Sequence, residues 1–119
     1  MIQGIGIDII EIKRIERLFY KTDRFIERIL TSNEITQFKK IQTDRRKVEF
    51  LAGRFAAKEA FAKATGKGIG ELSFQHIEIR YRTSGAPFIY ADGYESKNVL
   101  LSISHSKEYA VAQVIIEEK

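Results

Sequence analysis

The carboxylate most open to a chemical role is Glu59, four residues before Lys63 in the segment FAAKEAFAK (55–63). On a helix counted at about 100° per residue, Glu59 falls in the middle of the apolar stripe, while Lys63 and Lys58 border it. An ion pair between Glu59 and Lys63 explains the pattern without any ligand. A carboxylate that faces the apolar side needs a cation, a metal or a hydrogen-bond network, because desolvation of its charge is costly.

Asp8 is a second carboxylate in a comparable setting. Isoleucines alternate with glycines and an acid along the segment 3–12: Ile5, Ile7 and Ile9 against Gly4, Gly6 and Asp8. This alternation predicts a strand, and glycines in a strand often mark the close approach of a ligand or of another backbone. If Asp8 approaches Glu59, two carboxylates without thiolates suit a hard cation such as Mg²⁺ better than zinc.

A glycine-rich segment, GKGIG (66–70), follows the helix that carries Glu59. Its backbone N–H groups could face an anion, with Lys63 and Lys67 adding positive charge. It is not a P-loop, because the G-x-x-x-x-G-K-[ST] spacing is absent and the segment follows a helix. A helix C-cap followed by a turn explains the same residues.

The cluster SISHS (102–106) places hydroxyls and an imidazole at a strand end. Such groups contact phosphate or transfer protons. As a nucleophilic serine site the cluster is poor, because Ser104 and His105 lie on opposite faces of a strand and no G-x-S-x-G motif is present. A polar β-turn is the alternative interpretation.

Length and composition indicate a single globular domain over residues 1–119. The chain is 44% hydrophobic and 30% charged, as is usual for such a domain. No apolar run approaches the ~20 residues that span a bilayer, and the first residues lack the basic region and cleavage site of a signal peptide. With no cysteine there is no disulfide framework, thiolate zinc site or thiol nucleophile. We expect a cytoplasmic protein without a membrane partner.

Positive charge is concentrated between Lys13 and Lys47. This segment holds eleven Lys or Arg against five Asp or Glu, a net charge of +6 compared with +4 for the whole chain. Such a segment attracts an anionic partner: nucleic acid, an anionic membrane surface or an acidic protein. A solvated helical face without a partner is the alternative.

Periodicity predicts an α+β domain: one N-terminal strand, several helices including one long helix, and then a mainly antiparallel sheet. Helical spacing covers 14–21, 23–30, 31 to about 41, and 44–66, which Asp44 would cap and Gly66 would end. Alternation covers 73–83, 88–93, 98–106 and 108–118. His76 is then an ordinary strand residue. The last segment is nearly all apolar, which indicates a strand that is central or covered on both faces.

Four segments stand in order along the chain: GIDIIEI (6–12), FAAKEAFAK (55–63), the GAP turn (85–87) and SISHS (102–106). Together they resemble the phosphopantetheinyl transferase family, and among its members the short holo-acyl-carrier-protein synthases. The resemblance implies that family's fold, in a homotrimer with active sites between subunits. It also implies Mg²⁺-dependent transfer of phosphopantetheine from coenzyme A to a serine of apo-acyl carrier protein, in fatty acid biosynthesis. The products would be holo-acyl carrier protein and adenosine 3′,5′-bisphosphate.

The resemblance assigns roles to the matching residues. Asp8 and Glu59 would hold Mg²⁺ against the pyrophosphate of coenzyme A, and Lys63 would engage phosphate. Glu59, directly or through a metal-bound water, is the candidate base for the carrier serine, and His105 is the alternative. Larger members of the family carry a third carboxylate where this chain has Ile10, a place that water would fill. The contacts to coenzyme A would come from Arg54, Lys63, Gly66, Lys67, Gly68, Pro87, Ser104 and His105.

Acyl carrier proteins are strongly acidic, which gives the basic segment a partner. Six cations would steer the carrier protein and two apolar residues would anchor it: Arg14, Arg17, Lys21, Arg24, Arg28 and Arg45, with Phe25 and Ile26. Two alternatives are a basic nucleic-acid-binding module and a Mg²⁺-dependent nucleotide phosphohydrolase. The first leaves Glu59 unexplained and has no RNP-like, zinc or KH motif, and the second does not need the basic helices. We therefore expect no nucleic-acid partner.

Overall fold

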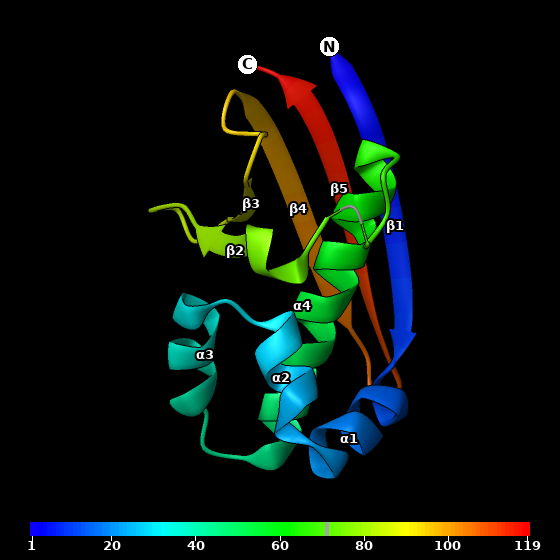
Figure 1. Ribbon diagram of the computed structural model, residues 1–119, viewed down its shortest axis with the longest axis vertical. Helices are drawn as coiled ribbons and strands as arrows, with labels where there is room; N and C mark the ends of the chain where they lie inside the picture. The colour runs from blue at the N-terminus through cyan, green and yellow to red at the C-terminus, as the bar shows by residue number, and fades with distance from the viewer. Residues whose placement is uncertain (71) are drawn as a thin grey trace.

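One antiparallel sheet and one long helix form the frame of the molecule (Figure 1). The computed structural model describes residues 1–70 and 72–119. The helices are α1 (Ile12–Lys21), α2 (Asp23–Ile29), α3 (Ser32–Lys39), α4 (Asp44–Thr65) and the short 3₁₀ helix η1 (Phe74–His76). The strands are β1 (Ile2–Glu11), β2 (Ile77–Tyr81), β3 (Pro87–Ala91), β4 (Lys97–His105) and β5 (Tyr109–Glu118). This order confirms the α+β prediction.

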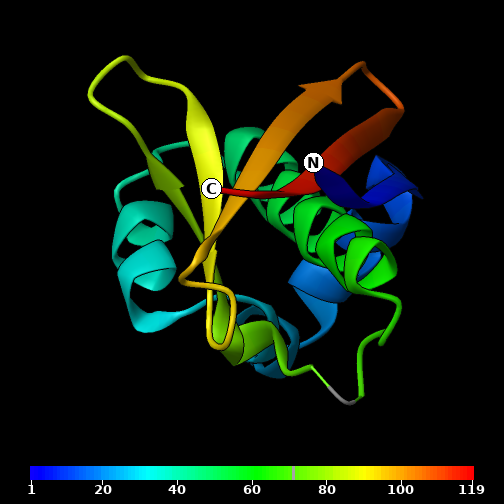
Figure 2. The same cartoon turned by 90° about the horizontal axis from the view of Figure 1, so that it is seen from above.

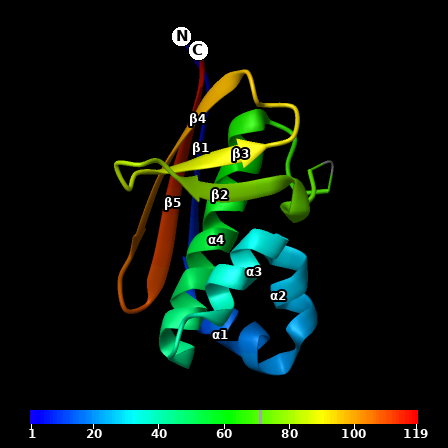
Figure 3. The ribbon, with the colours of Figure 1, turned by 90° about the vertical axis from the view of Figure 1, so that its left-hand side faces the viewer.

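The strands of the sheet have the order β1-β5-β4-β3-β2, and their pairings are antiparallel. β1, β5 and β4 pair over long registers, whereas β3 and β4 share one paired position, Phe88 with Leu100. The hairpin of β2 and β3 therefore turns away from the long strands and crosses them in Figure 3. β5 lies between β1 and β4, which confirms the central position predicted for the last strand.

Two glycines allow β1 to lie directly against α4. A Cβ at Gly4 would stand 2.1 Å from the carbonyl oxygen of Ala64, and a Cβ at Gly6 would stand 2.0 Å from that of Ala60. These distances are far inside van der Waals contact, so only glycine permits this approach. The sequence predicted the close approach of a ligand or of another backbone here, and the partner is the backbone of α4.

α4 packs against the sheet on one side and against α1, α2 and α3 on the other (Figure 2). Its buried residues consequently include Arg54 and Lys58 beside the apolar set. The single apolar stripe assumed from the sequence was wrong. Lys58, expected at its border, is fully buried, whereas Glu59, expected at its centre, is only partly buried. A helix that packs on two sides has no single buried stripe, so angular position alone did not rank these two residues.

The ends of α3 and α4 follow their capping residues. Thr31 and Glu34 make both hydrogen bonds of a capping box at the start of α3. Gly66 ends α4 in the left-handed conformation, with φ of 77°, as predicted. The start of α4 differs by one residue, because the Thr43 side chain, not that of the next residue, accepts the N–H of Arg46.

The start of β2 differs from the prediction that residues 73–83 form one strand. Ser73 accepts a hydrogen bond from the N–H of Gln75 and so begins η1. β2 then starts only at Ile77, and His76 belongs to the 3₁₀ helix. A side-chain hydrogen bond to the backbone therefore overrides the alternating pattern at this point.

The long strands expose the face that lies opposite α4, which we call the outer face. In Figures 2 and 3 the helices lie on the other side of these strands. Ile5, Ile7 and Ile9 are 61%, 58% and 63% exposed. The strand registers align the outer face in three rows: Ile5–Ile115–Leu100, Ile7–Gln113–Ser102 and Ile9–Val111–Ser104. Within the described part of the chain, no helix is long and apolar enough to cross a membrane.

Candidate functional site

Asp8 and Lys63 form an ion pair where β1 passes α4. The Nζ of Lys63 lies 3.0 Å from the Oδ1 of Asp8 and donates a second hydrogen bond, also of 3.0 Å, to the carbonyl oxygen of Ile7. The Asp8 side chain is 16% exposed and that of Lys63 is 56% exposed. The close contact at Gly6 brings the strand and the helix together here. Lys63 therefore pairs across to β1, where the sequence alone had left a pair with Glu59 open.

Glu59 lies near this ion pair and its surroundings disfavour its charge. Burial raises the pKa of the Glu59 carboxyl, and the negative charge of Asp8 raises it further. The positive charges of Lys63, Arg14 and Arg28 act in the opposite direction without cancelling the shift. A bound cation would favour the ionised form of Glu59.

The donor set of Asp8 and Glu59 fits a hard cation. Mg²⁺ is commonly held by one or two protein carboxylates, with phosphate and water oxygens completing its coordination. In residues 1–70 and 72–119, no three or more His, Cys, Asp or Glu side chains gather as a metal cluster. Burial is the main cause of the raised pKa of Glu59, and the charge of Asp8 is the second cause. A cation between the two carboxylates would offset both effects.

A hollow of about 510 Å³ opens beside Glu59, and we call it the carboxylate pocket. Three aromatic side chains form its apolar wall. The ring of Phe55 stacks on that of Phe74 with centroids 5.7 Å apart, and the ring of Phe25 lies 6.0 Å from that of Phe55. The same pocket is lined by two of the cations predicted to bind a carrier protein, Arg14 and Arg28. The structure thus joins the carboxylate to part of the basic surface.

A second hollow, of about 750 Å³, gathers Arg54, Pro87 and His105, and we call it the Arg54 groove. The guanidinium of Arg54 lies 4.1 Å from the ring centroid of Phe50 and donates to the Oε1 of Gln37 at 3.2 Å. A guanidinium held in this way is oriented to bind a phosphate or carboxylate. The Arg54 groove and the carboxylate pocket share no lining residue, so the described chain divides the predicted site residues between two places.

Ser104 lies apart from both hollows. It pairs with Val111 and belongs to the outer face, whereas His105 lines the Arg54 groove with its Nδ1 3.9 Å from the Oε2 of Glu49. Successive side chains of a strand point to opposite faces. Ser104 and His105 consequently do not meet one ligand within a single chain.

The glycine-rich segment 66–70 closes the end of α4. The N–H groups of Gly66, Lys67 and Gly68 donate to acceptors in the last turns of the helix, at 3.1, 3.2 and 3.3 Å. The predicted cradle of free backbone amides was therefore wrong at these three positions, because the helix uses the amides for its own C-terminus. The Nζ of Lys67 lies 5.9 Å from the ring centroid of Tyr94, and Lys67 lines neither the carboxylate pocket nor the Arg54 groove.

The residues predicted to bind a carrier protein lie mainly on α1 and α2. The charged ones are exposed, and the two apolar ones are partly buried. Arg45 differs because it lies on α4, where its Nε pairs with Glu49 at 3.2 Å and its Nη2 donates to the carbonyl of Lys107 at 2.7 Å. The α1 and α2 set consists of Arg14, Arg17 and Lys21, followed by Arg24, Phe25, Ile26 and Arg28.

Sequence reasoning missed a buried ion pair next to the site. The Nζ of Lys58 lies 2.6 Å from the Oε1 of Glu34, and both side chains are fully buried. Burial lowers the pKa of the Lys58 ammonium, although the Glu34 charge opposes this change. Glu34 also accepts the backbone N–H groups of Thr31 and Ile79, each at 3.0 Å. The first of these contacts belongs to the capping box of α3, but no sequence signal connected residues 34 and 58.

Comparison with known families identifies the family to which this fold belongs. A model described as the 4′-phosphopantetheinyl transferase superfamily matches residues 4–114. The chain therefore belongs to this superfamily. It is 56% identical over 119 residues to the holo-(acyl-carrier-protein) synthase of Oceanobacillus iheyensis, covering 100% of this chain and 99% of that protein. Identity to the synthase of Bacillus subtilis is 55% over 118 residues, which cover 98% and 97% of the two chains.

Solved structures give the same result. The fold matches a crystal structure of a holo-(acyl-carrier-protein) synthase from Bacillus anthracis in complex with CoA (3′,5′-ADP), with a TM-score of 0.89 and 53% identity, covering 100% of this chain and 99% of that one. The synthase of Helicobacter pylori in complex with coenzyme A matches with a TM-score of 0.79 and 38% identity, covering 95% and 99%. The predicted family and fold are confirmed.

Proposed function

We propose that this protein transfers phosphopantetheine from coenzyme A to a serine of an apo-acyl carrier protein. The products would be holo-acyl carrier protein and adenosine 3′,5′-bisphosphate. The observation that carries the proposal is the meeting of the Asp8–Lys63 pair and the Glu59 carboxyl with a pocket flanked by two arginines. The Asp8–Lys63 pair with the Glu59 carboxyl suits a phosphate group, and the two arginines of the pocket suit an acidic protein. Relatives of 55% and 56% identity named as synthases of this kind support it.

The reaction needs positioning and charge neutralisation more than a protein nucleophile. The serine oxygen of the carrier would form a bond to the phosphorus that bears the pantetheine arm. The bond from that phosphorus to the adenosine portion would break, and adenosine 3′,5′-bisphosphate would leave. Glu59 is the candidate acceptor of the serine proton, because its raised pKa makes it a stronger base than an exposed glutamate. Lys63 would neutralise charge on the transferred phosphate.

Asp8 and Glu59 would hold Mg²⁺ at this site. The ion, when bound, would supply neutralisation of the pyrophosphate charge. The chain's own contribution is to keep the two carboxylates side by side through the glycine contact of β1 with α4, at Gly4 and Gly6. His105 is a less favourable base than Glu59, because it lines the Arg54 groove and not the carboxylate pocket.

The Arg54 groove would bind the adenosine bisphosphate part of coenzyme A. Arg54 would contact phosphate, with Pro87 and His105 beside the base, and the 53% identical relative in complex with CoA supports a nucleotide role. Because the groove and the carboxylate pocket share no lining residue, we infer that each active site joins two chains of a homotrimer. The outer face, which includes Ser104, would form the contact between chains.

The exposed cations of α1 and α2 would bind the acidic carrier protein. We predict that the double variant Arg14→Glu, Arg24→Glu raises the KM for the carrier protein roughly tenfold or more, because it replaces attraction by repulsion. The KM for coenzyme A should change less than twofold. Steady-state kinetics with each substrate varied in turn measures both values. A Lys119→Glu variant is the control, because Lys119 is exposed and far from α1 and α2 along the chain. An unchanged carrier KM of the double variant would place the docking surface elsewhere.

One assay tests the proposed function against its alternatives. The protein is incubated with coenzyme A, Mg²⁺ and apo-acyl carrier protein, and the carrier is weighed by mass spectrometry. A mass increase equal to one phosphopantetheine group supports the transferase. Cleavage of coenzyme A without this increase would favour the phosphohydrolase. Neither product, together with salt-sensitive binding of an oligonucleotide, would favour the nucleic-acid module. A role in fatty acid biosynthesis in the cytoplasm belongs to the same proposal.

A further inference from the structure

The C-terminus of α2 leaves four backbone carbonyl groups without a partner inside the helix. The last helical hydrogen bond of α2 runs from the N–H of Leu30 to the carbonyl of Ile26, at 3.0 Å. The carbonyls that follow cannot be satisfied by the helix itself, as at any helix end. They belong to Glu27, Arg28, Ile29 and Leu30.

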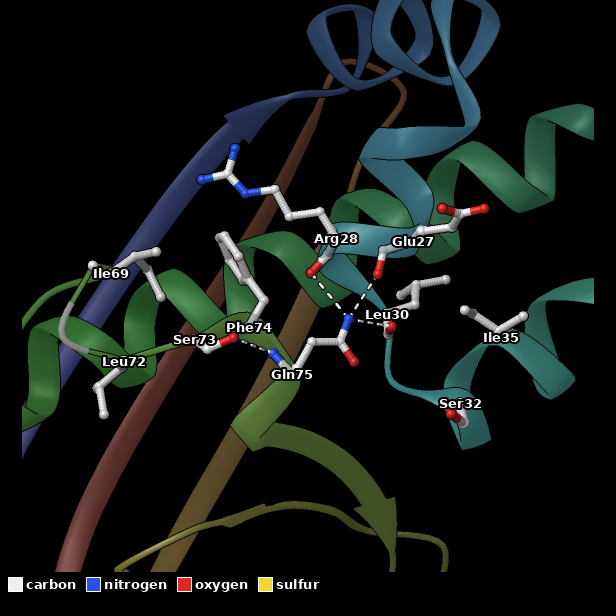
Figure 4. A pocket seen from close by; sticks show the side chains of 11 residues that line it. Glu27, Arg28, Leu30, Ser32, Ile35, Ile69, Leu72, Ser73, Phe74 and Gln75 are labelled. Atoms are coloured by element: carbon white, nitrogen blue, oxygen red, sulfur yellow. Dashed lines mark hydrogen bonds between the residues drawn. The ribbon is translucent and has the colours of Figure 1, made fainter.

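Two side chains from outside α2 donate to these carbonyls. The Nε2 of Gln75 donates to the carbonyls of Glu27, Arg28 and Leu30, at 2.7, 3.2 and 2.8 Å (Figure 4). The Nζ of Lys58 donates to the remaining carbonyl, that of Ile29, at 2.6 Å. The orientation of the Gln75 amide follows from these partners, because only its nitrogen can donate. The helix end is therefore fully satisfied by η1 and α4.

α2 depends on this support because its own stability is low. It has seven residues, and among them only Ile29 is buried. Helices of this length are marginal without tertiary contacts. η1 also holds the side chain of Arg28, whose Cζ lies 5.9 Å from the ring centroid of Phe74. Arg28 is thus held at its carbonyl oxygen by Gln75 and at its guanidinium by the ring of Phe74.

The supported helix carries three residues of the carboxylate pocket: Phe25, Arg28 and the buried Ile29. Phe25 and Arg28 line this pocket with Glu59, so the angle at which α2 leaves its C-terminus sets their position relative to the carboxylate. We propose that Gln75, acting with Lys58, is a positioning residue. It fixes the C-terminus of α2 and thereby holds Phe25 and Arg28 in the position relative to Glu59 that an incoming acidic protein requires. Gln75 itself lies outside the pocket and touches no reacting group.

Gln75 is suited to a test by substitution because it is exposed. It lines a neighbouring hollow of about 480 Å³ (Figure 4), which shares Arg28, Ile69 and Phe74 with the carboxylate pocket. Gln75→Leu removes both donors at nearly constant size. We expect its KM for the carrier protein to rise about five- to tenfold, with the KM for coenzyme A within twofold of the unaltered protein. Gln75→Lys, which restores a donor on a longer chain, should recover most of the loss. Amide hydrogen exchange of Gln75→Leu should quicken over residues 23–30.

Gln3→Leu is the matched control, since Gln3 also makes a side-chain hydrogen bond, to Glu118 at 2.8 Å, but far from α2. A carrier KM of Gln75→Leu within twofold of the control, equal rises of both KM values, or no recovery in Gln75→Lys would overturn the positioning role. If Gln75→Leu is insoluble, Gln75→Asn serves in its place, because its shorter amide does not reach all three carbonyls. This role presupposes the proposed transfer reaction. No transfer by the unaltered protein would remove that reaction, whereas transfer with an unaffected Gln75 variant would remove the positioning role alone.

Discussion

Glu59, which we propose as base and metal ligand, opposes the stability of the fold. Burial and the charge of Asp8 raise the pKa of its carboxyl above the ordinary value, so ionised Glu59 destabilises the folded state. The folded protein binds more protons than the unfolded protein between the two pKa values. Stability therefore falls as pH rises through this window, and the full penalty is present above it. Ionisable groups with shifted pKa values are concentrated at functional sites.

We predict opposite effects of Glu59→Gln on activity and on stability. Transfer activity should fall by roughly 10²-fold or more, because the amide neither accepts the serine proton nor holds a cation. At neutral pH the Tm should rise slightly, about 1–2 °C, because the disfavoured charge is gone. Below the ordinary carboxyl pKa the difference in Tm should disappear. Thermal unfolding at several pH values, with the transfer assay, checks both effects.

Glu95→Gln is the control for this experiment, because Glu95 is an exposed glutamate distant in sequence from the site. It should change neither activity nor Tm. Full activity of Glu59→Gln would show that Glu59 is neither the base nor a metal ligand. A lower Tm of Glu59→Gln at neutral pH would mean that the carboxylate stabilises the fold and that the direction of its pKa shift is wrong.

Lys58 is the preceding residue along the helix, and its role is structural. Its Nζ meets Glu34 and the carbonyls of Ile29 and Phe74, at 2.6, 2.6 and 3.1 Å. We predict that Lys58→Met lowers the free energy of unfolding by about 3–5 kcal/mol, because the buried Glu34 charge then keeps only its longer contact with the Nε of Arg54, at 3.7 Å. Urea unfolding measures this change.

The double variant Lys58→Met, Glu34→Gln distinguishes an unpaired charge from lost packing. The amide introduced by Glu34→Gln would keep an acceptor for backbone N–H groups but carry no charge, so the double variant should be more stable than Lys58→Met alone. Equal or lower stability of the double variant would contradict the assignment of the loss to the Glu34 charge. A loss below about 1 kcal/mol in Lys58→Met would place this pair with ordinary surface ion pairs.

At the scale of elements, the contact of β1 with α4 positions the two carboxylates. A Cβ at Gly6 would fall 2.0 Å from the carbonyl oxygen of Ala60, in backbone that cannot move independently of the helix. We predict that Gly6→Ala lowers the free energy of unfolding by ~1–3 kcal/mol or more, as overpacking does. It should also reduce transfer activity more than its effect on stability explains, because Asp8 moves relative to Glu59.

Gly53→Ala is the matched glycine control for this prediction. A Cβ there would lie 3.4 Å from the Cγ2 of Ile103, a flexible side chain, and alanine favours the helix by up to ~1 kcal/mol over glycine. Its stability should therefore be equal to or higher than that of the unaltered protein, as urea unfolding would show. Similar losses in both variants would mean that the close approach at Gly6 is not the cause.

Elements marked by local chemistry were predictable from the sequence. The capping box of Thr31 with Glu34, the left-handed Gly66 and the alternation along 3–12 each fix an element through neighbouring residues. The strand expected at 73–76 was wrong because one side-chain hydrogen bond to Ser73 started a 3₁₀ turn. The order of burial of residues 58 and 59 also was wrong, because it depends on packing from two sides of α4.

The site itself was predictable only in part, because its residues lie far apart along the chain. Asp8 and Glu59 were proposed as neighbours from bare glycines, and the structure brings β1 to α4 at these glycines. No pattern along the chain indicated the separation of Arg54 and His105 from the carboxylate pocket, although the family resemblance implied active sites between subunits. The engagement of α2 by Gln75 was not foreseen, since no local pattern relates residue 75 to a helix end at residue 30.

At the scale of the whole molecule, the two hollows and the outer face call for one explanation. The chain exposes three isoleucines of β1 on the outer face. Ile5 is in register with Ile115 and Leu100 and Ile9 with Val111, whereas the neighbours of Ile7 are polar. Exposed isoleucines along one strand are unfavourable in water and typical of an interface. The same chain separates its two candidate substrate regions. Association through the outer face would cover the exposed isoleucines. It would also allow a neighbouring chain to complete the divided substrate site, and we therefore propose a homotrimer.

We therefore predict that Ile7→Arg, in the middle row of the outer face, converts a trimer into monomers and abolishes transfer activity while the chain stays folded. Ile7 is 58% exposed in the single chain, so the charge harms an interface but not the core. Tyr20→Arg is the matched control, because Tyr20 is 65% exposed but lies on α1. Sedimentation equilibrium gives the mass of each variant, and circular dichroism reports its fold. A monomeric unaltered protein with full activity, or an Ile7→Arg variant that remains trimeric, would show that the outer face does not complete the site.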